Sequence, residues 1–70
     1  MGNEANIIGS TGHVTLAIQP GRLGQVMVRI GGGTQPYAAR AADRSLTIEE
    51  GSSVVITNYH PPQTVEVAPL

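Results

Sequence analysis

Three side chains are of the types that a hydrolase triad uses: Ser10, His13 and Asp43. A serine nucleophile needs a histidine base within hydrogen-bond reach and a carboxylate that orients that histidine. The residues around Ser10 do not form the Gly-x-Ser-x-Gly turn that presents the nucleophile in α/β-hydrolases. We therefore interpret His13 as an outward-facing strand residue, and we expect no catalytic residue and no enzymatic activity.

A metal site would have to draw its ligands from two histidines and a few carboxylates: His13, His60, Asp43, Glu49 and Glu50. The two histidines are far apart in the sequence and do not form a close pair such as His-x-x-x-His. Cysteine is absent, which excludes a disulfide framework and a thiolate zinc site. We expect no metal ligands, no cofactor-binding residues and no cofactor.

Two glycine-rich stretches invite comparison with phosphate-binding loops: Gly31-Gly32-Gly33 and Gly21-x-x-Gly24. A P-loop needs a following Lys-Ser/Thr and a helix, and a KH-type Gly-x-x-Gly needs flanking helices. Neither context is present, so the sequence predicts a hairpin turn at the first stretch. At the second it predicts a turn followed by a bulge or bend.

The chain has 70 residues, a formal net charge of −1, four Arg and no Lys. This balance argues against a polybasic surface for nucleic acid or membrane, and the absence of Lys removes Schiff-base chemistry. Trp and Phe are absent and there are only two Tyr, so a stacking platform for bases is not indicated. No apolar run approaches the roughly 20 residues that cross a bilayer.

The positions of the β-branched residues predict strands rather than helices. Seven Val, six Ile and six Thr suit a half-buried pleated surface, and Gly and Pro fall mostly between their clusters. Five segments are predicted to be strands: 12–18, 23–30, 35–42, 54–57 and 64–67. We expect a pinned loop over 43–51, with Gly51 in a turn that needs a positive φ, and a proline-stiffened loop over 58–63.

Five short strands in one small domain predict an all-β, five-stranded Greek-key barrel like the OB fold, whose closure removes exposed sheet edges. The inward positions of each alternating segment give the expected core: Val14, Leu16, Ile18, Val26, Val28, Ile30, Leu46, Ile48, Val54, Ile56, Val65 and Val67. We expect residues 1–6 to be a flexible N-terminal segment or an artificial extension, and residues 7–70 to form the domain.

The order of these features resembles the C-terminal domain of NfeD-like membrane proteins. The matching motifs, in chain order, are Ile8-Gly9 with Gly12, Pro20-Gly21, Gly24-x-Val-x-Val-x-Ile30, Tyr37-Ala38-Ala39-Arg40-Ala41, Ile48-x-x-Gly51-x-x-Val54-Val55-Ile56 and Val65-x-Val67-x-Pro69. The resemblance covers residues 7–70 and implies a small OB-type barrel. The double proline of the 58–63 segment departs from the family pattern.

The resemblance implies a membrane-associated full-length protein, of which this chain would be a soluble domain anchored by upstream transmembrane segments. It also implies a protein-interaction or scaffold role with stomatin-type or flotillin-type partners, linked to membrane protease regulation and membrane-protein quality control. The oligomeric state and the membrane side stay open. An enzyme, or an accessory to a protease, is one alternative.

An OB-type oligonucleotide-binding module is the other alternative, because OB folds often bind on strands 2 and 3 and the adjoining loops. The negative charge and the few aromatics argue against it. Arg22, Arg29 and Arg40 lie in those elements, and with Tyr59, Pro61 and Pro62, a possible apolar tip, they make up the candidate partner-binding surface.

Overall fold

The alternating β-branched segments form five strands in the computed structural model, which describes residues 7–70. The strands are β1 (Thr11–Leu16), β2 (Gly24–Ile30), β3 (Gly33–Ala41), β4 (Ser53–His60) and β5 (Thr64–Pro69). The expectation for residues 1–6 falls outside the described residues. Within residues 7–70, no helix has the length and apolar character needed to span a bilayer.

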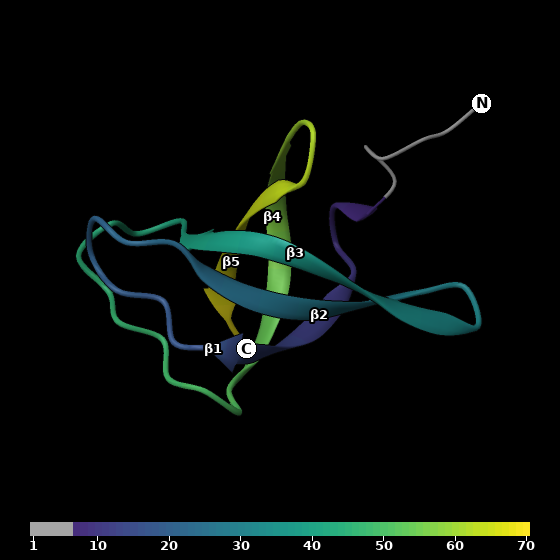
Figure 1. Ribbon diagram of the computed structural model, residues 1–70, viewed down its shortest axis with the longest axis horizontal. Coiled ribbons are helices and arrows are strands. Elements are labelled where there is room, and N and C mark those ends of the chain that lie inside the picture. The colour runs from purple at the N-terminus through teal and green to yellow at the C-terminus, as the bar shows by residue number, and fades with distance from the viewer. Residues whose placement is uncertain (1–6) are drawn as a thin grey trace.

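The strands close into a barrel in the order β1-β2-β3-β5-β4, with β1 paired to both β2 and β4 (Figure 1). The β3–β5 pair is parallel, and the other four pairs are antiparallel. This order is that of a five-stranded OB-type barrel. The predicted fold class is therefore confirmed, and the five predicted strands are all present with shifted ends.

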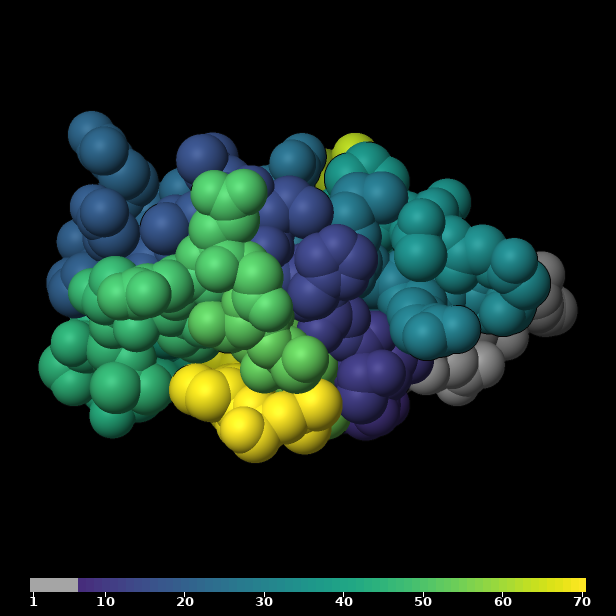
Figure 2. Space-filling model, turned by 90° about the horizontal axis from the view of Figure 1, so that it is seen from below, coloured from purple at the N-terminus to yellow at the C-terminus, as the bar shows by residue number. Residues whose placement is uncertain are grey.

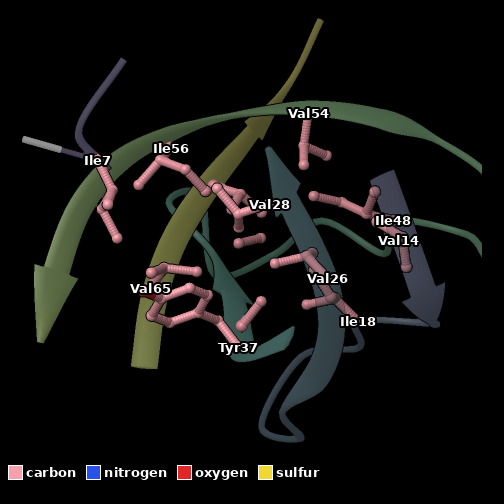
Figure 3. Close-up of a cluster of buried hydrophobic side chains, with 13 residues drawn as sticks. Ile7, Val14, Ile18, Val26, Val28, Tyr37, Ile48, Val54, Ile56 and Val65 are labelled. Carbon is pink, nitrogen blue, oxygen red and sulfur yellow. The ribbon is translucent and has the colours of Figure 1, made fainter. Parts of the chain in front are cut away.

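The barrel interior is filled by side chains from all five strands, together with Ile7, Ile18 and Ile48 (Figure 3). Val26, Val28, Val54, Val65 and Val67 are completely buried. Nine of the twelve predicted core residues are buried, and Ile30 is partly buried against the core. The core also includes four residues that the sequence interpretation left out: Ile7, Tyr37, Ala39 and Ala41.

Leu16 was predicted to be a core residue, and this is wrong because a bulge interrupts β1. The register shifts between Val14, which pairs with Val26, and Leu16, which pairs with Gln25. A bulge inserts one extra residue and changes the face on which the next side chain lies. Leu16 therefore lies on the same face as the exposed Gln25 and is 60% exposed.

The prediction of a loop over 58–63 is wrong for residues 58–60, because β4 contains a second bulge and continues beyond it. The register of β4 against β5 shifts between Ile56 and Asn58, and β4 then continues to His60. The turn is reduced to residues 61–63, with a cis bond between Pro61 and Pro62. Tyr59 pairs with Val65 and packs against the core rather than standing at an exposed tip.

The loop between β3 and β4 is anchored by Ile48, which is buried. Its backbone N–H and C=O both bond to Ile18, at 2.9 Å each, so the β1–β2 and β3–β4 loops lie side by side. Leu46 was also predicted to be in the core, and this is wrong. Its N–H closes a turn onto Asp43, and its side chain stays exposed. Gly51 has a φ of 91°, as the predicted turn requires.

Gly24 is the first residue of β2, and it is buried against the end of β1 and the residues that follow it. A Cβ atom at this position would collide with the backbone oxygens of Leu16 and Ala17 and with the side chain of Ile18. Only glycine allows this close approach of two backbones. Gly24 thus fixes where the β1–β2 loop leaves the barrel.

Candidate interaction surface

The six residues predicted to form one partner-binding surface lie in three separate parts of the barrel. Arg22 and Arg40 are at the β1–β2 loop and the end of β3, Arg29 is in the β2–β3 hairpin, and Tyr59, Pro61 and Pro62 are at the end of β4 and its turn. Figure 1 shows these three parts at different ends of the molecule. Arg22 and Arg40 meet at one hollow, Arg40 also reaches His60 at the end of β4 beside Tyr59 and Pro61, and Arg29 lies apart at the hairpin.

Arg22 and Arg40 line a hollow of about 240 Å³ together with Arg44, Leu23 and Leu46. We call these five residues and the space between them the arginine hollow. Its walls are the β1–β2 loop, the end of β3 and the β3–β4 loop. Figure 2 shows the two loops against each other at one end of the molecule, as the Ile18–Ile48 pairing requires. Three of the four arginines of the chain are at this place.

Arg40 is held at the edge of the hollow by an ion pair on the outer face of the barrel. Its Nε and Nη2 donate to Oε2 of Glu66 at 3.1 and 2.9 Å. The two residues face each other across the parallel β3–β5 pair. The hydrogen bonds from Arg40 lower the pKa of the Glu66 carboxyl, and its partial desolvation opposes this shift.

His60 completes this cluster from β4. Its Nε2 is 3.1 Å from Oε2 of Glu66 and 3.3 Å from Nη2 of Arg40. A protonated Nε2 donates to Glu66, whereas an unprotonated Nε2 accepts from Arg40. His60 therefore serves as a polar link between three strands.

Arg22 and Arg44 have no ion-pair partner among residues 7–70. The acid nearest to Arg44 in the sequence, Asp43, is engaged within its own turn. Its Oδ1 accepts from the N–H and the hydroxyl of Ser45, at 3.0 and 2.7 Å, and these bonds lower its pKa. The arginine hollow thus carries two guanidinium groups that form no ion pair within residues 7–70.

Sequence reasoning did not select Arg44, Leu23 or Leu46 as site residues. Arg40 and Arg44 are four positions apart in the sequence, but Arg40 lies within β3 and Arg44 lies in the loop that follows it. Only the long-range pairing of Ile18 with Ile48 brings their loop against the loop of Arg22. A local pattern in the sequence carries no signal for that contact.

A second, shallower hollow lies at the β2–β3 hairpin and is lined by His13, Arg29 and Thr34 with the three glycines between the strands. Arg29 is its one arginine, and no Val, Leu or Ile side chain lines it. The predicted hairpin turn at these glycines is confirmed. The volume of this second hollow is about 310 Å³, and, unlike that of the arginine hollow, its lining carries no leucine.

The rings of the two tyrosines pack against each other, Tyr37 in the core and Tyr59 partly buried at its edge. Their rings meet edge to face, with centroids 6.4 Å apart and an angle of 84°. The hydroxyl of Tyr59 donates to the carbonyl of Pro62 at 2.6 Å, which holds the ring against the turn. Base stacking on aromatic side chains is a main source of affinity in single-strand binders.

The residues considered for catalysis and metal binding are spread over the barrel. Ser10 precedes β1, His13 lies on β1 with its side chain exposed, and Asp43 is in the β3–β4 loop. No hydrogen bond joins any two of the three in the described structure. Over residues 7–70, no three His, Asp or Glu side chains gather into a metal-binding group.

Fold and site together define a five-stranded OB-type barrel with a cationic hollow between two loops. Residues 11–68 match the model of the NfeD C-terminal domain, and the chain belongs to that family. A search of curated proteins finds no match.

Two solved structures are similar to this chain. One is the solution structure of the soluble domain of the NfeD protein YuaF from Bacillus subtilis, with 26% identity and a TM-score of 0.81, covering 94% of this chain and 76% of that one. The other is the C-terminal domain of stomatin operon partner protein 1510-C from Pyrococcus horikoshii. It has 24% identity and a TM-score of 0.79, and the likeness covers 100% of this chain and 97% of that one. At this identity the second likeness concerns the fold.

Proposed function

We propose that the chain is a non-enzymatic protein-interaction module of a membrane-anchored NfeD-like protein, and that its partner is a stomatin-type or flotillin-type membrane scaffold. The observation that carries the proposal is the family match over residues 11–68. The name of the Pyrococcus horikoshii protein, a stomatin operon partner, supports a stomatin-type partner for this chain as well. Regulation of a membrane protease and membrane-protein quality control are the settings in which such a scaffold would act.

The composition of the barrel supports a binding role over a chemical one. The core is wholly apolar, with no buried polar or charged residue among those described. The polar groups of Arg40, His60 and Glu66 are engaged with one another on the outside. A surface of this kind presents shape and charge to a partner.

The test is direct binding between the purified domain and a stomatin-type protein from the same genome, measured by biolayer interferometry. A flotillin-type protein is the second partner, and an unrelated OB barrel is the control domain. We expect saturable binding of micromolar to submillimolar affinity, roughly −8 to −5 kcal/mol, only for the NfeD-type domain. Equal signals from the control barrel, or none with either scaffold, would contradict the proposal.

Oligonucleotide binding is the second candidate function, and it is favoured by one observation: Arg22 and Arg40 meet in one hollow of an OB-type barrel. A titration with single-stranded DNA and RNA at low salt decides it. Binding through phosphates should weaken steeply as salt rises. We expect no saturable shifts, because the tyrosines are turned toward each other.

A further inference from the structure

The arginine hollow combines positive charge with exposed apolar side chains. Leu23 is 49% exposed and Leu46 38% exposed, and both line the space between Arg22 and Arg44. Guanidinium groups bind carboxylates through paired, parallel hydrogen bonds. A ligand's apolar side chain about the size of leucine would pack against Leu23 and Leu46 and remove their apolar surface from water. The hollow therefore matches a ligand that carries a carboxylate next to an apolar group.

The charges around the hollow have a definite sign. The positive charge of Arg40 is compensated by Glu66, and Asp43 is bonded to Ser45 in its own turn. Arg22 and Arg44 form no ion pair among the described residues, and the third arginine without one, Arg29, lies away from the hollow at the β2–β3 hairpin. The chain as a whole has a net charge of −1, so this local excess of positive charge is set apart from the rest of the molecule.

The size and shape of the hollow point to a peptide side chain. Its volume of about 240 Å³ lies below the roughly 300–1,000 Å³ of small-molecule sites. A membrane surface contacts side chains that protrude, whereas these arginines and leucines line a depression between two loops held together by the Ile18–Ile48 pairing. One or two side chains of an extended segment would fill such a depression.

We propose that the arginine hollow binds an acidic-apolar segment of a partner protein, in which Asp or Glu side chains alternate with Leu-sized side chains. Arg22 and Arg44 bind the carboxylates, and Leu23 and Leu46 contact the apolar side chains. Arg40, fixed by Glu66, forms the rigid edge of the site. This inference rests on the proposed interaction function and names the chemistry of the partner segment.

The probe is an acetylated and amidated hexapeptide of alternating Glu and Leu, with a Gln-Leu hexapeptide as its neutral counterpart. Binding to the isotope-labelled domain is followed by NMR chemical shifts. We expect saturable shifts at Arg22, Leu23, Arg44 and Leu46 with the acidic peptide, and affinity lower by about tenfold with the neutral one. Equal binding of both peptides, or shifts centred outside the hollow, would overturn the proposal.

Single-residue variants distinguish binding at the arginine hollow from a general attraction between the charged peptide and the domain. R22E and R44E should each weaken peptide binding by about tenfold, whereas R29E, the same charge change at the β2–β3 hairpin, should weaken it less than about twofold. R22Q and R44Q keep the side chains long and should act in the same direction, so the result does not depend on how a charge reversal affects folding. Equal weakening by R29E would overturn the proposal.

Vesicles of phosphatidylglycerol and of phosphatidylcholine form the last arm. Shifts at the hollow with phosphatidylglycerol vesicles, and none with the acidic peptide, would identify a lipid surface as the ligand and overturn the peptide proposal. If R22E still binds a stomatin-type protein fully, the hollow is excluded and the interaction function stands. If the unchanged domain binds the peptide but neither scaffold, the interaction function fails with these partners and the hollow stands.

Discussion

Arg40 on β3 and Glu66 on β5 face each other across the parallel strand pair, and both Nε and Nη2 of the arginine donate to a single carboxylate oxygen. The side chain of Glu66 is 22% exposed and that of Arg40 38%. This pair joins the two strands that close the barrel by parallel pairing. It also fixes one edge of the arginine hollow.

The ion pair makes the stability of the domain depend on pH. The pKa of Glu66 is lower in the folded than in the unfolded chain, chiefly because of the Arg40 hydrogen bonds. The stabilisation is complete above the unfolded value of about 4.3 and is lost as pH falls below it through the folded pKa. Glu66→Gln should cost about 0.5–1 kcal/mol at pH 7, and this cost should vanish in acid.

Urea unfolding at pH 7 and at several values below 4.3 measures this dependence. Glu50→Gln is the matched control, because Glu50 is exposed and has no ion pair in the described part of the chain. A pH-independent difference between E66Q and the unchanged domain would contradict the role given to the pair.

Because of the bulge in β1, we expect substitutions at two residues that the sequence pattern places on the same face to differ greatly in their effect on stability. Ile18 is 1% exposed and Leu16 is 60% exposed. Ile18→Ala should therefore lower the free energy of unfolding by about 2–5 kcal/mol, and Leu16→Ala by less than about 0.5 kcal/mol. Thermal and urea unfolding of both variants checks this. Similar losses in the two would show that Leu16 is inside.

Gly24→Ala should be strongly destabilising, because its Cβ would meet the backbone oxygens of Leu16 and Ala17. Backbone atoms cannot move aside as a flexible side chain can, so we expect a loss of about 2–4 kcal/mol. Gly32→Ala is the control, since a Cβ there meets nothing within 4 Å. A G24A domain that melts at the temperature of G32A would contradict the close approach of residues 16–18 to Gly24.

Val28→Asp tests the register of the barrel core. Val28 is completely buried, and an aspartate there would be an unpaired charge in an apolar interior. We expect V28D to be unfolded at 25 °C by circular dichroism and NMR. Gln25→Asp, on the exposed face of the same strand, should stay folded. A cooperative melt of V28D would count against the core as described.

The prediction of the fold succeeded where the pattern is local. Alternating residues such as Val26 and Val28 identify a half-buried strand, and turn residues such as Gly51 mark where strands end. The two bulges could not be predicted, because Leu16 continues the alternation that Val14 begins. Only the pairing with β2 shows that an extra residue has been inserted.

The sequence predicted only part of the candidate site, because some of its residues are brought there by contacts between distant segments. Arg22 and Arg40 were selected because OB barrels bind through these elements. Arg44 and Leu46 enter the hollow through the Ile18–Ile48 contact, which joins loops distant in the sequence. Tyr59 was predicted to lie in a loop, whereas β4 continues past its bulge to His60 and pairs Tyr59 with Val65. Contacts between loops and register shifts are set by three-dimensional packing, so a single sequence does not show them.

The most direct test of the account is NMR mapping of the domain during titration with the soluble part of a stomatin-type protein. We expect saturable shifts that include Arg22, Leu23, Arg44 and Leu46, and their loss in R22E but not in R29E. It would be contradicted by shifts confined to the β2–β3 hairpin or the β4–β5 turn. It would also be contradicted by an affinity weaker than about 1 mM, which corresponds to about −4.1 kcal/mol.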